Sequence, residues 1–310
     1  MQLKLGILPW VQSTDWPELS SIARQVDRLG YDYLLVWDHL YAIFGDPYQP
    51  IYEGWTTLGA LATITERARI GLMVGANTFR NPALVAKSAV TLDHVSGGRA
   101  ILGLGGAWFG LEHEAHGLDF GSGFGERLDR LDEACSIVRP LLDGQEVTHD
   151  GPCYRTERLV CRPGPVQPRL PIMIGGSGER KTLRTVARYA DIWNGMGPVE
   201  LMARKVDVLE SWCTEVGRDP ASIERTLACK LVIRDSEAEA ERVWWQQMAH
   251  NRTTERDEHL WLGTPEAIAE RIRGYLPLGF RTVIAELPAP FDMETIERFI
   301  GEVKPLVEAS

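Results

Sequence analysis

The sequence predicts an α/β fold, and specifically a (β/α)8 or TIM barrel. Short apolar and β-branched runs alternate with longer amphipathic stretches along nearly the whole chain of 310 residues. Eight of the short runs have the composition of strands, and almost all are separated by a helical pattern, which is the order of a barrel of parallel strands. A doubly wound sheet has the same order, so the strand count alone leaves this second architecture open.

Capping signals mark several of the helices that follow these strands. Gly30 ends the first helix, and Asn81-Pro82 is a good N-cap and first-turn pair for the third. Ser236 with Glu239 has the capping-box pattern before a Trp-rich helix. The predicted strands cover residues 3–8, 33–37, 70–74, 100–104, 172–174, 192–194, 227–233 and 282–287. The predicted helices cover about 16–29, 54–66, 82–96, 126–142, 179–189 and 199–216, with three more that begin near 236, 264 and 293.

Residues 147–171 interrupt this alternation. The stretch is rich in Pro and Arg and contains short β-type runs in VTHDGPCYR and ERLVCRP. These runs predict a hairpin and a linker, inserted after the fourth strand. A typical domain length of ~150 residues would suggest two domains in this chain, but single barrels of ~200–400 residues are common. We therefore expect residues 1–310 to form one barrel domain with an insertion at about 147–171.

Composition restricts the partners. Lys and Arg number 33 and Asp and Glu number 43, for a net charge of −10, whereas nucleic-acid binding needs clustered basic residues. No run approaches the ~18 apolar residues of a membrane span. The five cysteines include no CxxC pair, so a disulfide framework is not expected. We expect a cytoplasmic protein whose partner is a small molecule, with no nucleic acid and no membrane.

Reactive groups of a barrel lie where the strands end and the following loops begin. Asp38-His39 stands at the end of the second predicted strand. Histidine titrates nearest to neutral pH, so this pair is the best acid/base candidate. An ordinary loop pair with structural hydrogen bonds remains the alternative.

A glycine-rich segment, Gly175-Gly176-Ser177-Gly178, follows the fifth predicted strand and precedes a helix. Small residues let the backbone approach a ligand, and a helix N-terminus offers free N–H groups to a phosphate. Arg180 and Lys181 add positive charge nearby. A tight turn that needs positive φ would also explain these glycines.

Other motifs fail on spacing. Arg180 stands where a Walker P-loop has its glycine before Lys181, and Glu179 stands where a nucleophile elbow has its second glycine. Trp108 takes the third glycine position of a dinucleotide fingerprint. The run Glu112–His116 lacks the second zincin histidine, because that position is Gly117. A metal site is therefore not expected.

The chain resembles the bacterial luciferase-like monooxygenase superfamily, and within it the deazaflavin (coenzyme F420)-dependent oxidoreductases. NPALVAK, DHVSGGR and ARYADIWN, in this order, are highly specific for the superfamily and much less specific for the flavin bound. The matching stretches run from about residue 3 to residue 272 and are GYDYLLVWDHL, EGWTTLGALATITERARIGLMV, NTFRNPALVAKSAVTLDHVSGGRAILGLG, AWFGLEHEAHG, GERLDRLDEA, PIMIGGSGERKTLRTVARYADIWN and GTPEAIAERI.

This resemblance implies a TIM barrel with an insertion after strand four and with the cofactor across its C-terminal mouth. The cofactor phosphate is expected on the backbone amides that open the helix after the glycine-rich segment. A non-prolyl cis peptide is expected at Met73-Val74, behind the central ring. His39 and Asp38 are the implied catalytic residues, His39 as proton donor or acceptor and Asp38 as anchor of the ring's polar edge. The implied cofactor-binding residues are Asp38, Met73, Val74, Asn77, Gly105, Gly106, Trp108, Gly175, Gly176 and Ser177.

One departure from the family bears on the substrate. Sugar-phosphate dehydrogenases of the family carry a catalytic Glu where this chain has Trp108, so a sugar-phosphate substrate is not carried over. We expect an F420-dependent oxidoreductase that exchanges hydride with an unidentified small organic substrate. The alternatives are an FMN-dependent monooxygenase that uses reduced flavin and oxygen, and a flavin-binding protein without catalysis. An isomerase or aldolase barrel would need a buried Lys or Glu at a strand end, and none is obvious.

Side chains around the mouth would shape the substrate site. Trp10, Trp37 and Trp108 are expected to build its apolar walls. The loops at 41–53, 118–125 and 248–261 would determine which substrate fits. Relatives in the family are commonly dimers, so a homodimer is expected.

Overall fold

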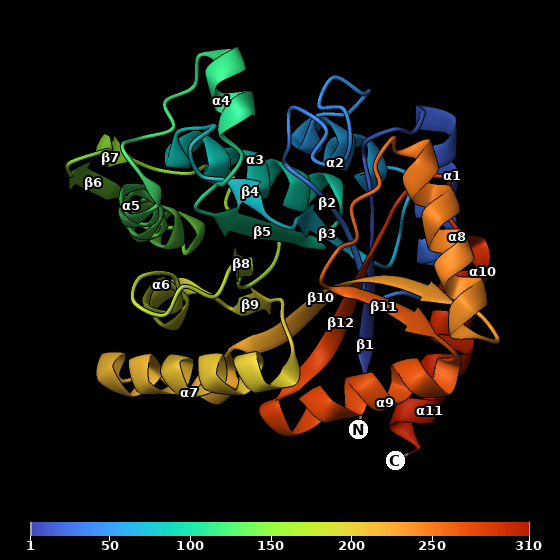
Figure 1. Cartoon of the computed structure of the whole chain (residues 1–310). Coiled ribbons are helices and arrows are strands. Elements are labelled where there is room, and N and C mark those ends of the chain that lie inside the picture. The colour runs from blue at the N-terminus through green and yellow to red at the C-terminus, as the bar shows by residue number, and fades with distance from the viewer. Residues whose placement is uncertain (1, 310) are drawn as a thin grey trace.

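The computed structural model describes residues 2–309. Within these residues eight parallel strands close into a barrel with helices around it (Figure 1). The ring closes because β1 pairs with both β2 and β12, and because β9 pairs with both β8 and β10. The predicted (β/α)8 barrel is confirmed, and an open doubly wound sheet is excluded. The barrel strands are β1 (Lys4–Pro9), β2 (Tyr33–Val36), β3 (Arg69–Leu72), β5 (Ala100–Gly105), β8 (Ile172–Gly175), β9 (Ile192–Gly195), β10 (Glu224–Ile233) and β12 (Phe280–Leu287).

Two further strands extend this sheet. β4 (Gly75–Ala76) pairs with β5 directly beyond β3. β11 (Leu260–Gly263) pairs with the second half of β10 and was not predicted, because residues 248–261 were assigned to a loop. The strand forms because β10 is ten residues long and its last four residues offer a free edge.

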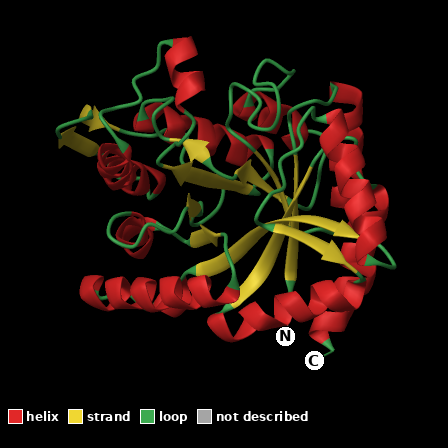
Figure 2. Cartoon of the chain, viewed as in Figure 1, coloured by secondary structure: helices red, strands yellow, loops and turns green. Residues whose placement is uncertain are grey.

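Helices cover the outside of the barrel (Figure 2). The predicted caps are present: the Asn81 side chain accepts from the Ala83 amide at 2.9 Å, and Ser236 accepts from Glu239 at 3.2 Å. None of the helices within residues 2–309 has an apolar stretch long enough to cross a membrane. The helices are α1 (Trp16–Leu29), α2 (Gly54–Ala62), α3 (Pro82–Val95), α4 (Gly110–His116), α5 (Phe124–Leu142), α6 (Thr182–Tyr189), α7 (Val199–Val216), α8 (Glu237–His250), α9 (Pro265–Tyr275), α10 (Met293–Arg298) and α11 (Lys304–Glu308).

Two helix boundaries differ from prediction, and tertiary contacts explain both. α2 ends at Ala62 rather than near 66, because the Asp27 carboxylate accepts the amides of residues 66–68 at 2.8–2.9 Å. α6 begins at Thr182 rather than 179. There the Glu179 side chain is held by Lys205 of α7 at 2.8 Å, and its carbonyl accepts from the Trp212 indole.

The insertion contains the predicted hairpin, formed by β6 (Val147–Asp150) and β7 (Arg155–Leu159), which pair antiparallel. Two carboxylates attach the insertion to the barrel helices. Glu133 on α5 accepts the Tyr154 amide at 2.9 Å, and buried Asp93 on α3 accepts the Val166 amide at 2.7 Å. The chain after the fourth barrel strand is therefore held on the outer helices α3 and α5.

Candidate functional site

A cavity of about 660 Å³ opens at the carboxyl ends of the barrel strands. Ten of the predicted site residues line it, although they come from loops after four different strands. The ten are Asp38, His39, Met73, Val74, Gly105, Gly106, Trp108, Gly175, Gly176 and Ser177.

Two predicted residues lie beside the cavity and do not line it. The Asn77 side chain donates to the Tyr154 hydroxyl at 3.0 Å, so it links the hairpin of the insertion to the barrel mouth. Trp10 is fully buried and stacks on Phe44, with ring centroids 4.3 Å apart. It therefore supports a wall residue, whereas Trp37 lines the cavity itself, as expected.

His39 pairs with a buried carboxylate that the sequence analysis did not assign to the site. Its Nδ1 lies 3.0 Å from Oε1 of Glu112 on α4, and the Leu40 amide donates to Oε2 of the same carboxylate at 2.8 Å. An ionised carboxylate only accepts hydrogen bonds, so Glu112 favours the tautomer with the proton on Nδ1. Nε2 is left to exchange a proton with a molecule in the cavity.

Asp38 offers one unpaired oxygen. Its Oδ2 accepts from the Ala76 amide at 3.0 Å and from Arg80 at 2.7 Å, and Arg80 also pairs with Glu53 at 2.6 Å. Burial raises the pKa of Asp38 above its ordinary value, and Arg80 offsets this shift only in part. Oδ1 is buried without a hydrogen-bond partner within residues 2–309. A buried unpaired acceptor of this kind fits a donor group on a bound molecule.

The Met73-Val74 peptide is cis, as the family resemblance implied. The Val74 side chain packs against two glycines of neighbouring strand ends. A Cβ on Gly105 would lie 2.7 Å from Val74 Cγ2, and a Cβ on Gly175 would lie 2.8 Å from it. Only glycine fits at both positions, because the Val74 side chain packs directly on the backbone of both strand ends.

The glycine-rich turn differs in part from the prediction. Gly176 has a φ of +109°, but its amide donates to the Asn194 carbonyl at 3.1 Å. Because α6 begins only at Thr182, the turn does not open the helix directly. Within residues 2–309 the Ser177 amide has no hydrogen-bond partner and remains available to a ligand. Lys181 turns to α5 and pairs with Asp129 at 2.6 Å.

Buried charges lie on the strands at another part of the cavity wall. Lys230 of β10 and Glu286 of β12 are register partners, and Lys230 Nζ lies 3.1 Å from Glu286 and 3.2 Å from Asp257. Burial lowers the pKa of Lys230, but the two carboxylates raise it more, so the net pKa is above its ordinary value. The expectation that no buried Lys or Glu stands at a strand end is therefore wrong. Both residues sit inside apolar runs, which hid them.

The three loops expected to shape the substrate site all reach the cavity. They contribute Phe44, Phe124 and Asp257, respectively. The Gln12 side chain bridges the first and third of these loops. Its amide donates to the Phe44 carbonyl at 3.1 Å and to the Asn251 side chain at 3.2 Å. The wall that carries Phe44 is thus tied to the segment that leads to Asp257.

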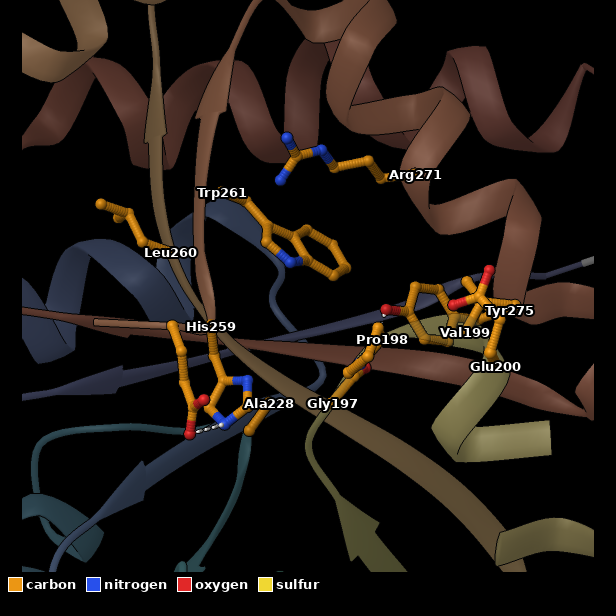
Figure 3. Close-up of a pocket in the computed structure, with 11 residues that line it drawn as sticks. Gly197, Pro198, Val199, Glu200, Ala228, His259, Leu260, Trp261, Arg271 and Tyr275 are labelled. Carbon is orange, nitrogen blue, oxygen red and sulfur yellow. Dashed lines mark hydrogen bonds and ion pairs between the residues drawn. The ribbon is translucent and has the colours of Figure 1, made fainter. Parts of the chain in front are cut away.

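A smaller hollow of about 470 Å³ lies next to this cavity, between β10, β11, α9 and the start of α7 (Figure 3). The Tyr275 hydroxyl donates to the Gly197 carbonyl at 2.9 Å across it. Glu258 and His259 border both spaces. None of the predicted site residues lines this hollow, so the larger cavity is the candidate active site.

The fold and this cavity define a (β/α)8 barrel protein with a candidate active site at its carboxyl-terminal mouth, and comparison with known proteins identifies its family. The model of the luciferase-like monooxygenase family matches residues 6–282. The chain belongs to this family, and the resemblance seen in the sequence is confirmed.

Individual relatives give more detail. The uncharacterised protein Rv0953c of Mycobacterium tuberculosis is 34% identical over 148 residues, 48% of this chain and 51% of that protein, so the match spans about half the relative's length. The F420-dependent glucose-6-phosphate dehydrogenase of Microbacterium testaceum is 28% identical over 313 residues, covering 92% and 91%.

Solved structures share the fold over nearly the whole of this chain. An F420-dependent secondary alcohol dehydrogenase, in complex with an F420-acetone adduct, has a TM-score of 0.86 at 20% identity, covering 99% of each chain. A long-chain alkane monooxygenase has a TM-score of 0.80 at 15% identity, covering 100% of this chain and 92% of the other.

Proposed function

We propose that the protein is a deazaflavin (coenzyme F420)-dependent oxidoreductase that transfers hydride between the cofactor and a small organic substrate. The observation that carries the proposal is the His39–Glu112 pair beside the unpaired Oδ1 of Asp38 in one cavity. Together these residues provide a proton-exchanging group and a buried acceptor for a ring N–H. Relatives named as F420-dependent enzymes support the same assignment.

The residues present fit a flavin-like cofactor. Asp38 Oδ1 would accept from the polar edge of the ring, and Val74, packed on Gly105 and Gly175, would offer an apolar surface to the ring. The free Ser177 amide would donate to the phosphate. When bound, a deazaflavin supplies hydride acceptance and donation, and the protein supplies orientation and proton transfer.

His39 would handle the proton of the reaction. In the oxidation of an alcohol, Nε2 would accept the hydroxyl proton, and in the reverse direction the same nitrogen would return it, while the bound cofactor would supply the hydride chemistry. Glu112 holds the imidazole by Nδ1, so Nε2 keeps its direction and its free lone pair. Met73, Trp37 and Phe44 border the same space and limit the access of water.

The FMN-dependent monooxygenase remains the second candidate, because the family that matches the chain is named for that chemistry. A deazaflavin has carbon in place of the flavin N5 and reacts poorly with oxygen. Oxygen consumption during turnover therefore separates the two functions. A flavin-binding protein without catalysis is disfavoured by the intact His39–Glu112 pair.

Cofactor titration tests the proposal directly. Purified protein is titrated with F420 and with FMN side by side, and binding is followed by fluorescence. We expect F420 to bind at micromolar concentrations and FMN to bind more weakly. Uptake of neither cofactor would refute the proposed function, and preference for FMN with oxygen consumption would establish the monooxygenase instead.

We also propose that residues 1–310 act as one barrel domain, as a homodimer, in the cytoplasm. Light scattering of the purified protein measures the assembly. A mass near 34.7 kDa, that of one chain, would contradict the dimer without affecting the cofactor assignment.

A further inference from the structure

Lys230, Glu286 and Asp257 form a buried charged cluster that the proposed hydride and proton transfer does not use. Lys230 and Glu286 are 5% and 4% exposed, and all three residues line the cavity. They reach it from β10, β12 and the segment before β11, whereas His39 follows β2. The cluster thus gives the cavity a second polar region, separate from the His39–Glu112 pair.

Hydrogen-bond accounting shows an incomplete cluster. Asp257 is satisfied, because Oδ2 pairs with Lys230 and Oδ1 accepts from the His259 amide at 2.7 Å. Glu286 pairs with Lys230 through Oε2 at 3.1 Å, and its Oε1 accepts no hydrogen bond from a residue within 2–309. Lys230 carries three N–H donors and uses two of them on carboxylates. One acceptor oxygen of Glu286 and one donor of Lys230 therefore remain for a molecule in the cavity that both residues line.

The charges of the three side chains determine which chemical group of a ligand can bind between Glu286 and Lys230. One cation and two carboxylates leave a net charge of −1, so the positive charge of Lys230 is already neutralised. A phosphate or carboxylate would meet a net negative cluster, and an ammonium group would meet Lys230 with no acceptor of its own. A hydroxyl group can donate to Glu286 Oε1 and accept the third N–H of Lys230 at the same time.

Apolar surface lies next to the cluster. The Phe44 ring centroid is 5.7 Å from Lys230 Nζ, and Phe44 is held by its stack on Trp10. An uncharged carbon chain would therefore contact Phe44 while its polar end reaches Glu286.

We propose that this cluster binds an uncharged hydroxyl group of the substrate, remote from the reacting carbon, and that it rejects phosphate esters at the same place. This inference rests on the proposed function, since it concerns the substrate of that site. It separates this chain from the sugar-phosphate specificity that the name of one relative states.

A matched set of secondary alcohols tests the proposal. Pentan-2-ol is compared with pentane-1,4-diol, 5-aminopentan-2-ol and 4-hydroxypentyl phosphate, with butane-1,3-diol and hexane-1,5-diol for shorter and longer reach. Binding to the F420-loaded protein is measured by calorimetry, and turnover by F420 absorbance. We expect the best diol to bind about 10-fold tighter than pentan-2-ol and the phosphate to bind more weakly.

Three results would overturn the proposal: tightest binding of the phosphate, tightest binding of the amine, or no advantage of any diol, including no detectable binding of the whole set. F420 titration of the same preparation is run in parallel. Normal F420 binding without a diol preference rejects the hydroxyl subsite alone, whereas failure to bind F420 rejects the proposed function.

Variants of Glu286 separate recognition from folding. Glu286→Gln removes one negative charge, so we expect the diol advantage to fall about 10-fold and the affinity for the phosphate to rise. Glu286→Asp shortens the side chain but keeps its charge, and should lose the diol advantage without any gain for the phosphate. Glu258→Gln is the matched control, because Glu258 lines the same cavity but its side chain is 87% exposed. Equal effects of Glu286→Gln on all ligands would indicate a structural role and contradict the proposal.

Discussion

His39 and Glu112 lie 73 residues apart in the chain, and their contact shows how single side chains complete this site. His39 follows β2 and Glu112 lies on α4, which follows β5. A histidine without this partner would have no fixed hydrogen bond to select which of its two nitrogens carries the proton. The carboxylate therefore acts as a positioning group, and its contribution is measurable separately from that of the imidazole.

We expect His39→Ala to reduce kcat about 10²–10⁴-fold, because it removes the group that we propose exchanges the proton. Glu112→Ala should lower kcat by a smaller factor, and Glu112→Gln should recover part of the loss, since its one amide oxygen can still accept from Nδ1 although the Leu40 amide then loses its acceptor. Steady-state kinetics with F420 measures each variant, with KM for the cofactor as a second readout.

Glu114→Ala is the control for these variants, because Glu114 lies on the same helix but is exposed. If Glu112→Gln and Glu112→Ala lose activity equally, the positioning role is wrong. Full turnover by His39→Ala would remove the catalytic role of the histidine.

If Asp38 anchors the cofactor ring as proposed, we expect cofactor binding to depend on pH. Its pKa is raised chiefly by burial, so the carboxylate takes up a proton at a pH above its ordinary value of 3.8. The deprotonated form accepts a ring N–H, and protonation removes this acceptor. We expect F420 affinity to fall as the pH decreases through that raised pKa, and fluorescence titrations across pH measure it.

The variant Asp38→Asn should bind F420 about 10-fold more weakly at neutral pH and lose most of the acid dependence. Asp46→Asn, in the loop that carries Phe44, is a control in which the pH dependence should persist. Unchanged pH dependence in Asp38→Asn would show that another group is responsible.

At the scale of elements, carboxylates set where secondary structure stops and where the insertion attaches. Asp27 ends α2 by accepting three successive amides, which no pattern within residues 54–66 indicates. Asp93 accepts the amides of Val166 and Gln167 and the Gln167 side chain, all at 2.7–3.1 Å. Both residues are buried and belong to helices remote in sequence from their partners.

Replacement of Asp93 by Ala should therefore lower the free energy of unfolding by about 2–4 kcal/mol, because it leaves buried donors unpaired. Urea denaturation measures the loss, and limited proteolysis should show faster cleavage near residues 160–170. Asp119→Ala serves for comparison, since that side chain is 72% exposed. A destabilisation no larger than that of the control would show that Asp93 does not hold the insertion.

At the scale of the whole molecule, Glu224 joins four strands at the end of the barrel opposite the cavity. Its carboxylate accepts from Thr282 of β12 at 2.6 Å, Tyr33 of β2 at 2.7 Å and Lys4 of β1 at 3.0 Å. Burial raises the pKa of Glu224, but these hydrogen bonds lower it more, so the net pKa is below 4.5. Its stabilising effect is complete above the unfolded-state pKa and is lost as the pH falls through the folded-state pKa.

Thermal melts at several pH values check this behaviour. Wild type should lose Tm as the pH drops below about 5, in part through Glu224. Glu224→Gln should melt at a lower temperature at pH 7 but lose less Tm on acidification. Parallel acid curves for both proteins would exclude Glu224 as a contributor.

Much of the fold was predictable because it depends on local pattern. The eight barrel strands, the caps at Asn81 and Ser236 and the hairpin at 147–159 all follow from residue periodicity and turn chemistry. β11 was not predictable in this way, because four residues become a strand only when the end of β10 offers an edge.

The candidate site was predictable where residues stand at strand ends in a known order, as Asp38, His39 and the glycines do. The sequence did not predict the positions of five other residues relative to the cavity, namely Asn77, Lys181, Glu112, Lys230 and Glu286. The first two are drawn away from the cavity by partners in other elements. The other three enter the site through burial and pairing, which a sequence does not display.

The sequence by itself therefore determined the barrel, its family and the location of the mouth, because strand order and glycine positions are properties of the chain. The tertiary structure decided which charges meet there. Lys230 is neutralised by Glu286 and Asp257, and His39 is held by Glu112, only because segments distant in the chain are packed together. Pairing of charges depends on distance in space, so the polarity that selects a substrate is fixed only in the folded molecule.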